Sequence, residues 1–155
     1  MTVKADTGRS WVQDHLKAYL ESGGSDGHLV DFTVLGGRAD QKTLLLRTVG
    51  RRSGTAKLAP LIYEKVGEEY AIIASKGGAP EHPGWYHNLA AAPEVRFQVG
   101  PEIFRGTCRE ADGAERERVW ARMVEAYAPY ADYQAKTSRR IPVILLKPLA
   151  TVAAL

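Results

Sequence analysis

Six short segments of β-forming residues, separated by turns, fill most of the chain after residue 42 and limit the folds available to it. The segments are TLLLRTV, LAPLIYEKV, YAIIAS, EVRFQV, IFRGTCRE and PVILLKP. Each is rich in leucine, β-branched or aromatic residues, as strands are. The first three are expected to be consecutive antiparallel strands, parted by the GRRSGTAK and GEE turns. The sequence therefore predicts a largely antiparallel sheet.

Two helices are expected to interrupt this sheet. HPGWYHNLAAAP predicts a short helix that starts near Pro83 and stops before Pro93, because proline has no amide hydrogen to donate. A second helix is expected from about Gly113 to Ala126, where apolar residues recur on one face. Helices beside an antiparallel sheet indicate an α+β fold, and closure into a small split barrel would remove the exposed sheet edges.

The first forty residues differ from the rest. Apolar residues recur at helical spacing between Trp11 and Leu20, and the glycine-rich SGGSDGHLVDFTVLGG follows. We therefore expect residues 1–40 to form an N-terminal amphipathic helix and a flexible loop, and residues 41–155 to form a split-barrel cofactor-binding domain. The helix is expected to pack on this domain, with a lid or a membrane contact as alternatives.

The composition favours one cytoplasmic domain. A chain of 155 residues, 45% of them hydrophobic, can bury a single core. Its single cysteine, Cys108, cannot form an internal disulfide, which favours a reducing compartment. No apolar run reaches the roughly 18 residues of a membrane span, and the N-terminus lacks the apolar core of a signal peptide. Location at the inner membrane face is the alternative.

Cations cluster in the segment RTVGRRSGTAK, although the net charge is only +3. Guanidinium, ammonium and hydroxyl groups in one glycine-containing turn are suited to bind phosphate or carboxylate. The spacing of a Walker loop is absent, and no GxGxxG opens a helix. A solvated basic hairpin is the alternative. Nucleic acid is not expected as a partner, because no aromatic residues are interleaved with these cations.

A second cluster, ASKGGAPEHPGWYHNL, joins glycines to aromatic and polar side chains. Glycines let a planar ligand approach the backbone, Trp85 offers a flat surface, and Ser75 and Asn88 offer polar groups for ring edges. Simple anchoring of the helix is the alternative for Trp85. His82 and His87 are five residues apart with no carboxylate at zinc-site spacing, so no metal is expected.

A third cluster, AYAPYADYQAKTSRR, holds three tyrosines at intervals of three residues. If the chain stays helical beyond Pro129, Tyr127, Tyr130 and Tyr133 lie on one side and present hydroxyl donors on an apolar wall. Half-buried packing is the alternative for any one of them. Templates for hydrolytic catalysis are absent from the sequence, so an enzyme of this kind would depend on a cofactor.

These three clusters, in this order, resemble the deazaflavin-dependent nitroreductase and quinone reductase family, whose members use coenzyme F-420. The resemblance runs from about Thr43 to Pro148 and implies the split β-barrel of flavin-binding proteins, with the N-terminal helix and two further helices. It implies that the phosphate and the acidic tail of the cofactor are held by Arg51, Arg52, Ser53 and Lys57. It places along the cofactor ring system Leu58, Ala59, Pro60, Leu61, Ser75, Lys76, Gly77, Trp85 and Asn88.

The same resemblance places the substrate against Tyr63, Tyr127, Tyr130 and Tyr133, with Tyr130, Tyr133 and Ser75 as the catalytic donors. The implied reaction is hydride transfer from the reduced deazaflavin to quinones, activated enones or nitro compounds. Two alternatives stay open: an FMN-dependent oxidoreductase of the same fold, and a non-catalytic carrier of a cofactor or a lipophilic ligand. The expected partner is a small-molecule electron acceptor, and the chain is expected to be a monomer or a homodimer.

Overall fold

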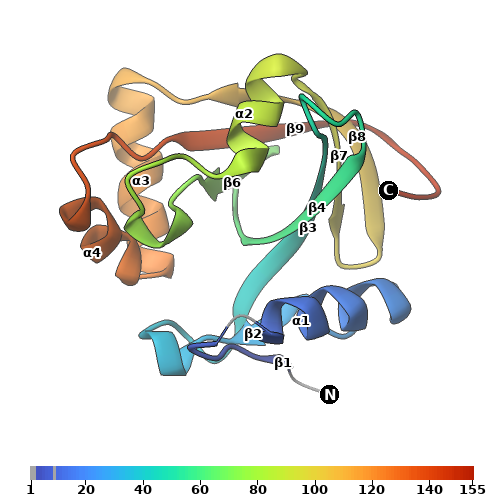
Figure 1. The fold of residues 1–155 in the computed structure, drawn as a ribbon, viewed down its shortest axis with the longest axis horizontal. Helices are drawn as coiled ribbons and strands as arrows, with labels where there is room; N and C mark the ends of the chain where they lie inside the picture. Colours follow the sequence, from blue (N-terminus) through green and yellow to red (C-terminus); the bar gives the residue numbers. More distant parts are fainter. Residues whose placement is uncertain (1–2, 9) are drawn as a thin grey trace.

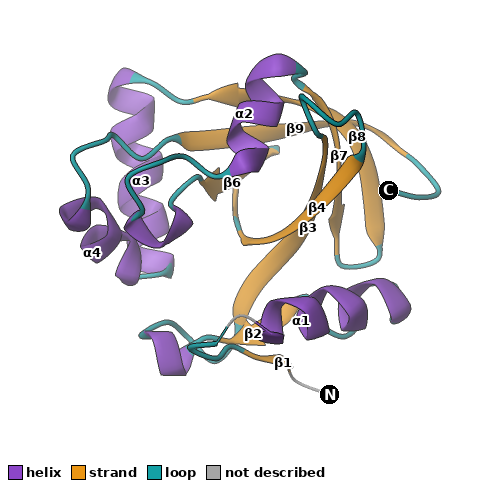
Figure 2. Cartoon of the chain, viewed as in Figure 1, coloured by secondary structure: helices purple, strands orange, loops and turns teal. Residues whose placement is uncertain are grey.

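The protein folds into one mixed sheet that curls into a half barrel, with helices on its outer side and across one end (Figures 1 and 2). The computed structural model describes residues 3–8 and 10–155. The strands are β1 (Val3–Lys4), β2 (Leu29–Asp31), β3 (Gln41–Val49), β4 (Ala56–Ile62), β5 (Glu64–Val66), β6 (Glu69–Ile73), β7 (Glu94–Val99), β8 (Glu102–Glu110) and β9 (Val143–Thr151). The α-helices are α1 (Ser10–Glu21), α2 (Gly84–Ala91), α3 (Gly113–Ala126) and α4 (Pro129–Lys136). This architecture confirms the predicted α+β split barrel.

The strand order is β1-β2-β3-β7-β8-β9-β6-β5, and β4 pairs with β3 outside this path. All strand pairs are antiparallel except β1 with β2. β3 is the central connection, because its start pairs with β2 and its remainder pairs with β4 and β7. Leu45 of β3, for example, pairs with Pro60 of β4 on one side and with Gln98 of β7 on the other. β3 therefore joins the barrel to the elements that precede it, β1, α1, β2 and the 3₁₀ turn at Thr33–Leu35, which we call the N-terminal unit (Figure 1).

The prediction of a single strand over LAPLIYEKV is wrong. The chain changes its pairing partner at Tyr63, so that β4 lies beside β3 whereas β5 lies beside β6. The backbone amide of Tyr63 still donates to the Lys42 carbonyl, at 3.2 Å. β6 then pairs with β9 and not with β4. In this pairing Ile72 lies opposite Ile144. Three consecutive paired strands are therefore replaced by two hairpins.

The N-terminal segment packs on the barrel and makes hydrogen bonds to it, although the sequence predicted a helix followed by a flexible loop. The Tyr19 hydroxyl on α1 donates to the Thr43 carbonyl at 3.0 Å and accepts from the Gly100 amide at 2.8 Å. Burial raises the pKa of Tyr19 to about 12. The expected loop also contains β2 and a 3₁₀ turn at Thr33–Leu35, elements too short for periodicity to reveal. The aromatic side of α1 therefore packs on the protein.

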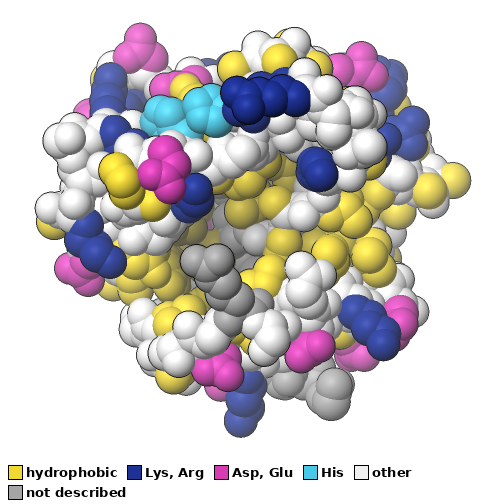
Figure 3. Space-filling model, viewed as in Figure 1, with side chains coloured by type: hydrophobic (Ala, Val, Ile, Leu, Met, Phe, Trp, Pro, Cys, Tyr) yellow, Lys and Arg dark blue, Asp and Glu magenta, His cyan; other side chains and the backbone are white. Residues whose placement is uncertain are grey.

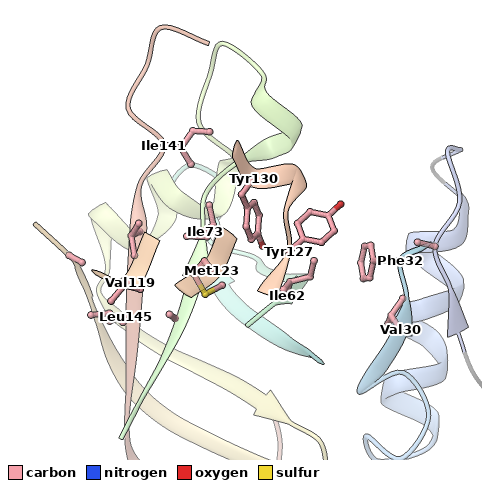
Figure 4. Close-up of a cluster of buried hydrophobic side chains, with 14 residues drawn as sticks. Val30, Phe32, Ile62, Ile73, Val119, Met123, Tyr127, Tyr130, Ile141 and Leu145 are labelled. Carbon is pink, nitrogen blue, oxygen red and sulfur yellow. The ribbon is translucent and has the colours of Figure 1, made fainter. Parts of the chain in front are cut away.

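Alternating residues of β6 and β9 divide the core into two clusters, because successive side chains of a strand point to opposite faces. Ile72 and Ile144 point into the barrel, where they join leucine and aromatic residues of β3 and β7. Ile73 and Leu145 point to the outer face, where α3, α4 and the N-terminal unit cover them. Figure 4 shows this outer cluster, in which Tyr127 reaches toward the N-terminal unit.

The helix boundaries follow local sequence signals. α2 ends two residues before Pro93, and α3 begins after Asp112, whose side chain accepts a hydrogen bond from the Gly113 amide at 2.7 Å. Pro129 occupies the first turn of α4, where a missing amide hydrogen costs nothing. α2 and α3 confirm the two expected helices, and α4 adds a third that carries two of the three tyrosines.

Candidate functional site

An aromatic cavity of about 420 Å³ opens between the N-terminal unit, β4, α2 and α4. Figure 3 shows this face hollowed, with hydrophobic side chains in the hollow and cations near its rim. The barrel side contributes Pro60, Leu61, Ile62, Ile73, Ser75, Lys76, Gly77, Pro83 and Trp85. The remaining lining residues are Trp11, Val12, Phe32, Leu35, Tyr127, Tyr130 and Tyr133.

A second cavity, of about 440 Å³, lies beside the turn between β3 and β4, and we call it the cationic cavity. Its lining residues are Gly50, Arg51, Arg52, Ser53, Lys57, Leu58, Ala59, Gly84, Trp85 and Asn88. The two cavities share Trp85 and take successive residues of β4. A ligand with a charged tail and a planar ring could therefore lie along β4 with its ends in different chemical surroundings.

The cations of this turn are available to a ligand. Arg51, Arg52 and Lys57 are exposed, and no carboxylate among the described residues forms an ion pair with them. The turn itself is ordered by short-range bonds, with the Ser53 and Thr55 hydroxyl oxygens 2.8 Å apart. Uncompensated cations on a fixed turn fit the phosphate and the carboxylates of the F-420 tail better than the single phosphate of FMN.

Asn88 holds the cationic turn onto α2. Its side-chain oxygen accepts from the Arg51 amide at 3.1 Å, and its amide nitrogen donates to the Thr48 hydroxyl at 3.0 Å. Asn88 was expected along the cofactor ring, whereas it lines the cationic cavity and both of its polar groups are used within the protein. Asn88 therefore positions the cationic turn. The residue type alone could not distinguish this role from contact with the cofactor ring.

The segment after β6 brings Ser75, Lys76 and Gly77 to the aromatic cavity. The Ser75 hydroxyl makes no hydrogen bond within the described residues, so it is available to a ligand. Lys76 differs, because its ammonium group lies 2.9 Å from a Glu81 carboxylate oxygen. That pairing lowers the pKa of Glu81. Lys76 therefore lines the cavity with its charge already compensated.

The three tyrosines gather as the spacing predicts. The hydroxyl oxygens of Tyr127 and Tyr133 are 3.0 Å apart, and the Tyr130 ring stands edge-on to both neighbours. Tyr130 is 4% exposed, and its hydroxyl makes no hydrogen bond within residues 3–8 and 10–155. Burial raises the pKa values of Tyr127 and Tyr130. Both phenols therefore stay protonated near neutral pH and act as hydrogen-bond donors.

Tyr63 does not join them. It is absent from the lining of the aromatic cavity and lies in the barrel interior against Tyr70. Its hydroxyl oxygen is 2.7 Å from Nε2 of His28. Its side chain follows the alternation of β4, in which Leu61 and Tyr63 pack in the barrel interior and Ile62 packs in the outer cluster. The sequence pattern alone does not say which of these faces carries the site.

The N-terminal unit supplies wall residues that the sequence analysis did not assign to the site. Trp11, Val12, Phe32 and Leu35 line the aromatic cavity. The Phe32 ring contacts Trp11 and Tyr127 edge-on, with centroid distances of 5.5 and 5.6 Å. The position of Trp11 on the apolar side of a predicted helix was the available signal. That position indicated that Trp11 is buried, but it did not indicate which residues Trp11 packs against.

Neither a metal site nor a membrane-spanning helix is present among the described residues. No group of three or more His, Cys, Asp or Glu side chains in the described part of the chain is placed to hold a metal ion. None of the described helices is long and apolar enough to cross a membrane.

Comparison with known proteins agrees with this geometry. The family model described as F420H(2)-dependent quinone reductase matches residues 11–148. The chain belongs to this family. It is 42% identical over 107 residues to an F420H(2)-dependent quinone reductase of Mycobacterium tuberculosis, covering 67% of this chain and 72% of that protein.

Two solved structures support the assignment to the F420H(2)-dependent quinone reductase family. A structure of an F420-H2 dependent reductase is 45% identical, with a TM-score of 0.63, and the match covers 68% of this chain and 93% of that one. A domain-swapped dimer is 39% identical, with a TM-score of 0.65, and the match covers 89% of this chain and 98% of that one. The predicted oxidoreductase class and the predicted cofactor, coenzyme F-420, are thereby confirmed.

Proposed function

We propose that this reductase binds coenzyme F-420 along β4 and reduces a quinone in the aromatic cavity. The observation that carries the proposal is that the two cavities are adjacent. Both are lined by Trp85, and they are lined by successive stretches of β4, Lys57 to Ala59 in one and Pro60 to Ile62 in the other. Activated enones and nitro compounds are expected as further acceptors, because a wall of apolar and aromatic side chains selects for flatness more than for one pattern of hydrogen bonds.

We assign the two ends of the cofactor to different residues. Arg51, Arg52, Ser53 and Lys57 would bind its phosphate and acidic tail, and Leu58 to Leu61 would follow its ring system. Trp85 would separate the two regions. Ser75 and Gly77 would meet the ring edge from the opposite wall. When bound, the reduced deazaflavin supplies a hydride to an electron-poor acceptor.

The chain's own contribution to the reaction is positioning and hydrogen-bond donation. Tyr130 presents an unpartnered hydroxyl in an apolar cavity, and the Tyr127–Tyr133 pair keeps one further phenolic proton for a ligand. A hydrogen bond to the acceptor oxygen stabilises the negative charge that develops there, and it does so more strongly where water is excluded. We place Tyr130 and Tyr133 first in this role and Ser75 next.

Cofactor binding and turnover test the proposal together. The purified protein is titrated with F-420 and, separately, with FMN, and oxidation of reduced F-420 is then followed with menadione and a nitroaromatic compound. We expect F-420 to bind more tightly and its oxidation to depend on the acceptor. Tighter binding of FMN would favour the flavin-dependent alternative. Binding of F-420 without acceptor-dependent oxidation would favour a carrier.

We further propose that residues 1–40 and 41–155 are separable units and that the chain forms a homodimer by exchange of the first. The support is the similar structure that is a domain-swapped dimer, and the short β2–β3 pairing, which is the strand pairing that joins described residues of 1–40 to residues 41–155. Light scattering across a concentration series tests this assembly. A constant monomer mass would exclude it.

A further inference from the structure

The wall of the aromatic cavity formed by residues 74–82 has an unfavourable backbone. Lys76, Gly77 and Gly78 all have positive φ angles, of 46°, 63° and 83°. The left-handed region is costly for a residue with a Cβ atom, so the surroundings must hold Lys76 there. Within the segment only two backbone bonds help, from the Gly78 amide to Ser75 and from the Ala79 amide to Lys76. The Lys76–Glu81 ion pair adds one side-chain contact within the segment, and the other side-chain hydrogen bonds to it come from outside.

Arg139 makes these four hydrogen bonds. Its Nε donates to the Ala79 carbonyl at 2.8 Å, and its Nη2 donates to the Ser75 carbonyl at 2.7 Å. Its Nη1 donates to the Ala74 carbonyl at 3.2 Å and to Nδ1 of His82 at 3.0 Å. The four acceptors span the beginning, the middle and the end of the segment. A planar guanidinium with five fixed donors matches such a set, which a lysine cannot reproduce.

The backbone at Arg139 is fixed in turn to the helix that carries the tyrosines. Gln134 on α4 donates from Nε2 to the Arg139 carbonyl at 2.7 Å and accepts from the Ile141 amide at 3.0 Å. Gln134 follows Tyr133 directly in the sequence. The chain from α4 to β9 therefore connects both walls of the aromatic cavity.

The two walls are also in direct contact. A Cβ atom at Gly78 would lie 2.7 Å from the carbonyl oxygen of Tyr133 and 3.0 Å from its Cα, so the segment and α4 approach as closely as a glycine allows. Any movement of the segment relative to α4 changes the separation of Ser75 from the tyrosines. Arg139 lies outside the lining of both cavities, so it can act on a ligand only through the residues that it holds.

We propose that Arg139 is a positioning residue for the reductase, holding residues 74–82 against α4 so that Ser75 and the Lys76–Gly77 backbone meet the cofactor ring beside the tyrosines. The proposal rests on the function proposed above. It assigns to Arg139 a part in cofactor affinity and in turnover, although its charge lies away from the cationic turn.

Three variants test this assignment. Arg139→Met removes the four bonds and keeps the aliphatic stem, Arg139→Lys keeps the charge, and Arg140→Met is the control because Arg140 is the exposed neighbour of equal charge. F-420 affinity is measured by direct titration at several salt concentrations, turnover is measured with menadione, and folding by thermal melting. We expect Arg139→Met to weaken binding and lower kcat about tenfold each, and Arg139→Lys to do so to a smaller extent.

The salt dependence and a double-mutant cycle distinguish positioning from charge and from general destabilisation. The slope of affinity against salt should stay that of the wild type in Arg139→Met, because the tail contacts are intact. Combined with Ser75→Ala, the loss in kcat should be clearly less than the sum of the two single losses. Millimolar guanidinium should partly restore Arg139→Ala.

Several results would overturn the assignment of Arg139. Full additivity with Ser75→Ala, or an Arg139→Met protein that behaves like Arg140→Met, would each do so. If Arg139→Met does not fold, Arg139→Lys decides, and wild-type affinity and kcat in that variant would refute the role. A wild-type protein that neither binds F-420 nor oxidises it would overturn the proposed function itself, which is a different outcome.

Discussion

The hydroxyl oxygens of Tyr127 and Tyr133 lie 3.0 Å apart, so that each phenol orients the other inside the aromatic cavity. One of the two donates in this hydrogen bond, and the other keeps its proton for a ligand. Tyr130, between them in the sequence, makes no such bond within the described residues. The cavity therefore offers two hydroxyl protons to an electron acceptor, one from Tyr130 and one from the Tyr127–Tyr133 pair.

Removal of one phenolic hydroxyl at a time should separate these roles. Tyr130→Phe and Tyr133→Phe should each lower kcat with menadione about tenfold, since a hydrogen bond to developing charge is worth about 1.5–3 kcal/mol. F-420 affinity should stay within about twofold of wild type. Tyr63→Phe is the control, because its hydroxyl bonds to His28 away from the cavity. Equal losses of affinity and turnover would instead mean that the tyrosines are structural.

Charge removal in the cationic turn should affect binding and spare turnover at saturation. Arg51→Ala with Lys57→Ala should weaken F-420 binding about tenfold or more at low salt, with a smaller difference at high salt because ions screen exposed charges. Titration of the cofactor at two ionic strengths measures this. Lys147→Ala is the matched control, since Lys147 is also exposed but lines neither cavity. An unchanged affinity would remove the turn from the binding site.

Close packing between residues 74–82 and α4 makes Gly78 sensitive to substitution. Gly78→Ala should cost about 1–2 kcal/mol for its left-handed backbone and more for the overlap with the Tyr133 backbone. Gly67→Ala, at a φ of 62° with no atom within 4 Å of the added Cβ, should cost the backbone part alone. Denaturant unfolding compares the two. Equal losses would show that α4 moves aside at little cost.

His15 should make the protein less stable in acid. The residue is buried, its Nε2 donates to the Gly27 carbonyl at 2.8 Å, and its Nδ1 has no hydrogen-bond partner among the described residues. Burial lowers the pKa of His15 below its usual 6.5, with the Gly27 bond opposing this in part. The unfolded chain therefore binds the proton more readily, and stability is retained above pH 6.5 and lost as the pH falls through the lowered pKa.

The measurement is the free energy of unfolding between pH 7.5 and 5. Its decline toward acid should be shallower in His15→Gln, by up to about 1.4 kcal/mol for each pH unit between 6.5 and the lowered pKa of the folded state. His87→Gln is measured alongside as the same substitution at a half-buried histidine. Parallel slopes in wild type and His15→Gln would show that another group is responsible.

The sequence was most informative where periodicity and glycine or proline signals act locally. α2, α3 and the hairpin of β7 with β8 follow such signals, and the three candidate segments were selected because charge, glycine or aromatic residues cluster within them. Partner choice could not be read in this way. At Tyr63 the chain changes its pairing partner from β3 to β6, and that choice is made by the tertiary fold.

The same limit applies to the site. Spacing predicted that the tyrosines meet, since they share one local segment. The meeting of Phe32 with Tyr127 joins residues that are far apart in the chain, and the four bonds from Arg139 do the same. A single sequence contains no signal for such pairs. Asn88 illustrates a related case, because its residue type suggested contact with a ring and its observed partners are Arg51 and Thr48.

Among the described residues, β4 has one partner only, so a row of backbone amides and carbonyls along it faces the cavities instead of another strand. Such a row is a template on which a second chain could grow a sheet. Pro60 interrupts it with a residue that has no amide hydrogen, and proline in sheets is confined to edges of this kind. The strand on which we propose that the cofactor lies thus carries its own protection against aggregation when no ligand covers it.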